Sequence, residues 1–218
     1  MNEDPYVVLE WASSSSALPS GEPTDYVYEY RGDLVDVGES SERTLVGRFG
    51  FFYMDLDRAT NNGMPWFDVF DTHASTISYY EAFYDVRTGH YSRRITNLLG
   101  CEPINSNALI LDRLEILPKY RGKKLGLRVL RPMIERFSSG PGVVALKPFP
   151  LQLEGGGERN ESDEWRKNLR LAEFSSNAKS STRELMQYYA TLGFEKLRGT
   201  AFMISSNDFA LPKIGNAD

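Results

Sequence analysis

The chain has almost none of the residues that build disulfides and metal sites. It contains one cysteine, Cys101, and two histidines, His73 and His90, among 218 residues. A single cysteine excludes an intramolecular disulfide and a cysteine-rich zinc site, and it fits a reducing compartment. We therefore expect no metal centre. Cys101 follows a Leu-Leu-Gly segment and is interpreted as a small buried residue rather than a nucleophile.

Long apolar runs and clustered basic residues are also missing. No window approaches the roughly eighteen apolar residues that a membrane span needs. The acidic start, MNEDPYVVLEW, lacks the basic region and apolar run of a secretory signal. Lys and Arg number 25 against 30 Asp and Glu, a net charge of −5, whereas nucleic-acid binding needs clustered positive charge. We therefore predict a cytoplasmic protein that binds neither membranes nor nucleic acid.

The residues that are present suit a globular domain. Apolar residues make up 41% of the sequence, enough for one core over residues 1–218. Residues 6–11, 26–37 and 43–56 are rich in β-formers and predict strands. Residues 88–106 have no regular pattern. Between them, apolar residues at helical spacing predict one helix over residues 66–84, formed by Phe67, Phe70, Ala74, Ile77, Tyr80 and Tyr84.

Strand and helix patterns alternate in the second half of the chain. Residues 107–117 and 142–147 predict strands, residues 122–137 and 182–192 predict helices, and residues 194–205 contain one or two closing strands. Most connections in compact domains have about 2–6 residues, so we interpret residues 155–181 as an insertion. Within it, Trp165, Leu169 and Ala172 form a short helical pattern. This order indicates a mixed α/β sheet.

One strand–turn–helix segment, residues 114–127, has the composition of an anion site. Its sequence is LEILPKYRGKKLGL, in which a strand ends at a proline and a turn with two glycines enters a helix. The first N–H groups of a helix have no internal partners, and the helix dipole favours negative charge there. Arg121, Lys123 and Lys124 add positive charge. The alternative is a strand–helix turn with solvated basic residues.

The segment resembles motif A of the GNAT superfamily of N-acetyltransferases. The run Ile-Leu-Pro-Lys-Tyr-Arg-Gly at residues 116–122 leads into the turn Arg-Gly-Lys-Lys-Leu-Gly at residues 121–126. Residues 188–194, Tyr-Tyr-Ala-Thr-Leu-Gly-Phe, resemble motif B of the same family. The resemblance covers roughly residues 107–205. One departure is Lys124, which replaces the first glycine of the family's turn. The backbone amides can still point at a pyrophosphate if Lys124 is already helical.

This resemblance implies a fold, a co-substrate and its contacts. The expected fold is α/β (α+β), with a mixed, mainly antiparallel central sheet flanked by helices. Acetyl-CoA or another acyl-CoA would lay its pantetheine arm along the end of the motif A strand and its pyrophosphate on the amides of the turn. The residues that would contact it are Leu114, Glu115, Ile116, Arg121, Gly122, Lys123, Lys124, Leu125, Gly126 and Leu127.

Two further residues are candidates for the chemistry. The family often uses a tyrosine at the position of Tyr189 to protonate the departing thiolate, and an exposed phenol with a pKa near 10 is protonated at neutral pH. Asp112, four residues before Ile116, is the candidate base, acting through water. Strand alternation predicts that Asp112 shares a face with Leu114 and Ile116. Packing of Tyr189, ion pairing of Asp112, and Glu81 or bulk water as the base are the alternatives.

Three hypotheses follow for function. The first is an N-acyltransferase that moves an acetyl or other acyl group from acyl-CoA to a primary amine on a small molecule or a protein. The second is a catalytically weak or inactive acyl-CoA-binding regulatory module of the same fold. The third is an unrelated α/β protein whose turn matches by coincidence. A homodimer is compatible with each of them.

Overall fold

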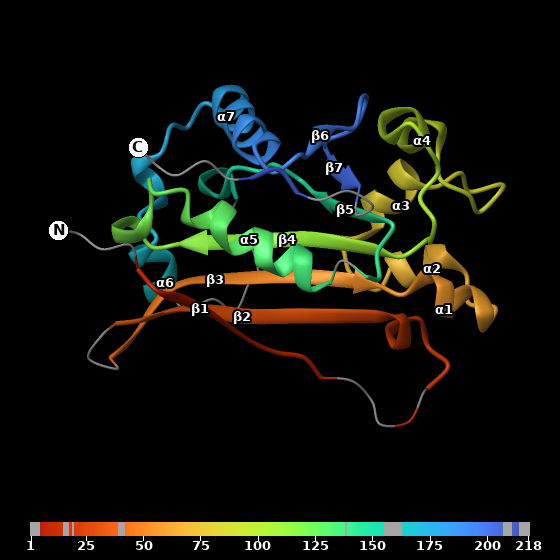
Figure 1. Ribbon diagram of the computed structural model, residues 1–218, viewed down its shortest axis with the longest axis horizontal. Coiled ribbons are helices and arrows are strands. Elements are labelled where there is room, and N and C mark those ends of the chain that lie inside the picture. The colour runs from red at the N-terminus through yellow and green to blue at the C-terminus, as the bar shows by residue number, and fades with distance from the viewer. Residues whose placement is uncertain are drawn as a thin grey trace.

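A seven-stranded sheet forms the centre of the computed structural model, which describes residues 5–14, 18, 20–38, 42–137, 139–154, 163–206 and 211–213. Its order is β1-β2-β3-β4-β5-β7-β6, and neighbours are antiparallel except β4 and β5, which are parallel (Figure 1). The strands are β1 (Val7–Ala12), β2 (Val27–Val37), β3 (Arg43–Met54), β4 (Ala108–Ile116), β5 (Val143–Leu146), β6 (Glu195–Lys196) and β7 (Met203–Ser206). The predicted mixed, mainly antiparallel sheet flanked by helices is confirmed.

Alternate residues of the central strands pack into two different hydrophobic clusters, one on each face of the sheet. Phe52 and Ile110 belong to the cluster that contains α1 (Leu56–Asn61), α2 (Trp66–Phe70), α3 (Ile77–Phe83) and α4 (Arg93–Leu99). Phe51 and Leu109 belong to the other cluster, which contains α5 (Leu125–Arg136) and residues of α7 (Ala178–Ala190). Successive residues of a strand point to opposite faces of the sheet, so these neighbours enter different clusters because both faces of the sheet are buried. In Figure 1, α5 crosses the front of the sheet and α6 (Asp163–Asn168) lies behind the end of β4.

The helix predicted over residues 66–84 is wrong as one element. It is divided into α2 and α3 by a turn over residues 71–76. Thr76 is fully buried, and its hydroxyl donates to the carbonyls of Phe70, at 2.5 Å, and His73, at 2.8 Å. Such side-chain hydrogen bonds to the backbone favour a turn over a continuous helix. The region expected to be irregular, residues 88–106, contains α4.

Other boundaries also differ from the prediction, for local reasons. The side chain of Asn177 accepts from the amides of Lys179 and Ser180, so α7 begins at Ala178, four residues before the predicted start. Conversely, α5 begins at Leu125 rather than at residue 122. Cys101 is exposed, which contradicts the predicted burial. No helix in the described ranges is long and apolar enough to cross a membrane.

Candidate functional site

The parallel strands β4 and β5 pair over only part of their length. Residues 108–111 of β4 pair with residues 143–146 of β5, after which β4 continues to Ile116 while the chain leaves β5 through Pro148 and Pro150. No described strand pairs with residues 112–116 on this edge. The backbone edge of β4 therefore lines an opening between the two strands, at the place where parallel strands of α/β folds commonly bind ligands.

A β-bulge lies where the strands separate. Gly50 of β3 pairs with Arg113 and Phe51 pairs with Leu111, so Asp112 is an extra residue in β4. Bulges change the direction of neighbouring side chains and often lie beside functional sites. Because of this extra residue, Asp112 does not share a face with Leu114 and Ile116. That expectation was wrong: Leu114 and Ile116 pack with the α5 cluster, whereas Asp112 lies near Arg31 and Tyr79.

Two cavities meet in this opening. The larger, about 570 Å³, lies against the turn before α5, and we call it the turn cavity. The smaller, about 340 Å³, lies against Asp112, and we call it the bulge cavity. The turn cavity is lined by all the predicted co-substrate residues except Lys123 and Leu127. Both sizes fall in the range of small-molecule sites. The residues that line both cavities are Leu114, Phe149, Leu151 and Tyr189.

The turn before α5 has an unusual backbone. Lys124 is the N-cap residue of α5 and has a left-handed conformation, with φ +55° and ψ +20°. From the sequence, the turn amides were expected to point at a phosphate only if Lys124 were already helical, and it is not. A side chain makes the left-handed region unfavourable by about 1–2 kcal/mol, whereas glycine adopts it without this penalty. The conformation explains why a glycine is expected at this position.

The first amides of α5 are covered by a tyrosine. The Leu127 N–H donates to the Tyr188 hydroxyl at 3.0 Å, and a Cβ placed on Gly126 would lie 2.6 Å from the same oxygen. Burial raises the pKa of Tyr188, partly offset by the amides of Leu127 and Gly126. The sequence indicated Tyr188 only as part of the motif B segment. Tyr188 instead satisfies amides that the turn was expected to offer to a pyrophosphate.

The Arg121 side chain contacts the end of β4 and the segment that follows α6. Its Nε donates to the Ile116 carbonyl at 2.8 Å, and its Nη2 donates to the Leu169 carbonyl at 2.6 Å. Its guanidinium also stacks 4.7 Å from the Phe174 ring centroid. Desolvation lowers the pKa of Arg121, which stays charged because its ordinary pKa exceeds 12. Its side chain therefore joins the turn to Leu169 and Phe174, which also line the turn cavity.

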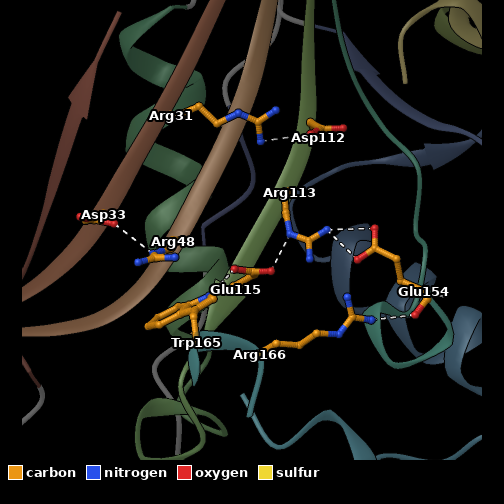
Figure 2. Close-up of polar contacts among 9 residues, drawn as sticks. All are labelled: Arg31, Asp33, Arg48, Asp112, Arg113, Glu115, Glu154, Trp165 and Arg166. Atoms are coloured by element: carbon orange, nitrogen blue, oxygen red, sulfur yellow. Dashed lines mark hydrogen bonds and ion pairs between the residues drawn. The ribbon is translucent and has the colours of Figure 1, made fainter. Parts of the chain in front are cut away.

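Behind β4, a buried ionic network joins α6 to the sheet (Figure 2). Glu115 has only 1% of its side chain exposed and accepts from Arg113 Nε at 2.5 Å and from Trp165 Nε1 at 2.7 Å. Arg113 also donates to both carboxylate oxygens of Glu154, at 3.1 and 2.9 Å. The Arg48 guanidinium lies 4.3 Å from the centroid of the Trp165 ring. Apart from the Arg113–Glu115 pair, these contacts join residues at least 41 positions apart, which no local sequence pattern indicates.

Tyr189 lies at the junction of the two cavities, on α7. The sequence suggested an exposed phenol, whereas the side chain is half-buried; desolvation, with Tyr188 beside it, raises the pKa of Tyr189 above its ordinary value. The phenol is therefore protonated across the physiological range. Tyr189 can donate a proton or a hydrogen bond to an atom placed between the cavities.

Asp112 presents an incompletely bonded carboxylate to the bulge cavity. Its side chain is 10% exposed, and its Oδ2 is buried without a hydrogen-bond partner. Its ion-pair partner is Arg31, whose Nη1 lies 3.6 Å from Oδ2, too far for a hydrogen bond. Leaving a buried acceptor unsatisfied is unfavourable by about 1–3 kcal/mol, so the site favours a ligand that brings a donor. The alternative base, Glu81, is exposed on α3 and outside both cavities.

Comparison of the chain with known protein families, curated proteins and solved structures finds no match. No family model matches the chain, and no curated protein or solved structure matches it significantly. Within the described ranges, no three His, Cys, Asp or Glu side chains are grouped as potential metal ligands.

Proposed function

We propose that the protein is an N-acyltransferase that moves an acetyl or other acyl group from acyl-CoA to a primary amine by direct transfer. The observation that carries the proposal is the meeting of two cavities at Tyr189, one against the turn before α5 and one against Asp112. Direct transfer requires a donor and an acceptor that reach one point from separate sites. The GNAT-like motifs, residues 116–127 and 188–194, border the same opening and support the proposal independently.

The turn cavity has the composition that an acyl-CoA requires. Its walls supply apolar side chains for a pantetheine arm, among them Leu114, Ile116 and Leu185. The unpaired edge of β4 offers backbone groups to the amides of the same arm. The pyrophosphate would bind at the N-terminus of α5, on the amides of Gly126 and Leu127. This binding requires the Tyr188 hydroxyl to leave the Leu127 amide, because both need the same N–H.

The transfer step uses the two groups at the bulge cavity. A neutral amine nitrogen attacks the thioester carbonyl, so a C–N bond forms and the C–S bond breaks. The proton lost by nitrogen passes through water to Asp112, and the departing thiolate takes the proton of the Tyr189 hydroxyl. Proton return from Asp112 to Tyr189 through solvent restores both residues. The products are an amide and free CoA thiol.

A second candidate function is acyl-CoA binding without efficient turnover. It is favoured by the Tyr188 hydroxyl on the helix amide and by the left-handed Lys124, both of which oppose close approach of a phosphate. In this case the protein would respond to acyl-CoA by releasing Tyr188 from α5.

Thiol release from acetyl-CoA and longer acyl-CoAs, measured with a panel of primary amines, tests the proposal. We expect amine-dependent release, and we expect Tyr189→Phe to lower kcat about a hundredfold, since a positioned acid contributes roughly 10²–10⁴-fold, with acyl-CoA affinity retained. Unchanged turnover in Tyr189→Phe would remove this residue from the mechanism. Binding of acyl-CoA without release for any amine would favour the second candidate.

A further inference from the structure

Opposite charges meet beside the bulge cavity: Asp112 lines this cavity, and Arg31 lines a neighbouring one. Arg31 of β2 reaches across β3 toward Asp112 of β4, and their nearest charged atoms are 3.6 Å apart (Figure 2). The contact is too long for a hydrogen bond, and Asp112 Oδ2 has no hydrogen-bond partner. The pair is thus an ion pair without a hydrogen bond.

The position of Arg31 is fixed by its neighbours. Its Nε donates to Glu29 Oε1 at 2.6 Å, which holds one side of the guanidinium and directs Nη1 toward Asp112. Gly50, the residue paired with Arg31 across the sheet, leaves the space that the guanidinium fills; a Cβ there would lie 2.7 Å from Nη1. Half of the Arg31 side chain is exposed, so a ligand can reach it.

A simple amine complements the charge of Asp112 but not that of Arg31. Its ammonium could donate to Asp112, but it would then lie beside the guanidinium of Arg31, and like charges at such a distance repel each other. A carboxylate next to the amine removes the repulsion, because it accepts charge-assisted hydrogen bonds from arginine, often two in parallel. An α-amino acid carries both groups on one carbon.

We propose that the acceptor is a zwitterionic α-amino acid whose amino group binds Asp112 and whose carboxylate binds Arg31. This inference rests on the proposed acyltransferase function and names its substrate class. The remainder of the bulge cavity favours an apolar side chain on the amino acid, because aliphatic and aromatic residues form most of that wall. They are Tyr79, Leu111, Leu130, Met133, Leu146 and Leu153.

A substrate series in the wild-type protein tests the inference without any mutation. Thiol release from acetyl-CoA is compared for leucine, leucinamide and the decarboxylated amine 3-methylbutylamine. We expect kcat/KM for leucine to exceed that for the other two by roughly tenfold to a hundredfold, the value of one charge-assisted hydrogen-bond set. Equal or faster reaction of the amine or the amide would overturn the inference while leaving the acyltransferase function intact.

Arg31→Gln provides the second test. We expect KM for leucine to rise roughly tenfold to a hundredfold, with kcat/KM for 3-methylbutylamine unchanged or higher. Arg43→Gln is the matched control, since Arg43 pairs with Glu10 at the far end of the same sheet, and it should alter neither value. An equal loss for leucine and the amine in Arg31→Gln would overturn the inference. Absence of thiol release with every acceptor would overturn the proposed function and this inference together.

Discussion

Replacement of Trp165 by phenylalanine should destabilise the protein by weakening the contact between α6 and β4. The indole Nε1 donates to Glu115 Oε2 at 2.7 Å, and the Glu115 side chain is 1% exposed. Phenylalanine keeps most of the ring but provides no donor. One oxygen of a buried carboxylate would then lose that hydrogen bond, and water has little access to replace it.

The magnitude follows from two contacts. A hydrogen bond to a charged group contributes about 1.5–3 kcal/mol, and stacking of Arg48 on the ring, at 4.3 Å, contributes about 0.5–1 kcal/mol, part of which phenylalanine retains. We therefore expect the free energy of unfolding to fall by roughly 1.5–4 kcal/mol. Glu115→Gln in the Trp165→Phe background should then show non-additive loss, because the two residues share one interaction.

Urea denaturation followed by fluorescence and circular dichroism measures this loss, provided that both probes give coincident transitions. Trp66→Phe is the matched control: its indole donates to Thr60 at an exposed site, so its loss should be at most about 1 kcal/mol. If Trp165→Phe lowers the free energy of unfolding no more than Trp66→Phe does, Glu115 is not desolvated as described and the network does not hold α6 on β4.

Two further predictions concern the turn and the alkaline stability. Lys124→Gly should raise the free energy of unfolding by about 0.5–1 kcal/mol in urea denaturation, since glycine adopts the left-handed backbone without strain. Lys124→Ala keeps a Cβ atom and therefore the strain, so it should give no such gain. An equal gain in both variants would contradict the backbone explanation. Burial raises the pKa of Tyr53 to about 12, so the folded state holds this proton more tightly than the unfolded state. Its contribution is complete below about pH 10 and is lost as the pH rises toward 12. The urea midpoint of Tyr53→Phe should therefore fall less than that of the wild type between pH 9 and 11, and parallel curves would refute this assignment.

The sheet was largely readable from the sequence, because strand signals are local. Runs of β-branched and aromatic residues marked β2, β3 and β4 within a few residues of their ends. The helix predicted over residues 66–84 failed because apolar spacing continues across a turn that buried Thr76 stabilises. A period alone does not reveal a break of this kind when the residues on both sides pack on one cluster.

The candidate site was predicted in outline and missed in its details. The residues of the turn and Tyr189 do border one opening. The bulge that redirects Asp112 depends on how β3 pairs with β4, which the sequence of β4 alone does not specify. The contacts of Tyr188 with Leu127 and of Trp165 with Glu115 join residues that are 61 and 50 positions apart. The charged residues Arg113 and Glu115 within an apolar strand were the available signal for a buried ionic network.

Equilibrium binding of CoA, measured by titration calorimetry at fixed salt, tests the central claim that the opening between β4 and β5 holds an acyl-CoA. We expect saturable binding to the wild type and at least a tenfold weaker affinity in Gly126→Val, whose side chain would fill the space beside the first amides of α5. Arg131→Gln, further along the same helix, should bind as the wild type does. No binding by the wild type at millimolar CoA, or unchanged affinity in a folded Gly126→Val, would contradict the account.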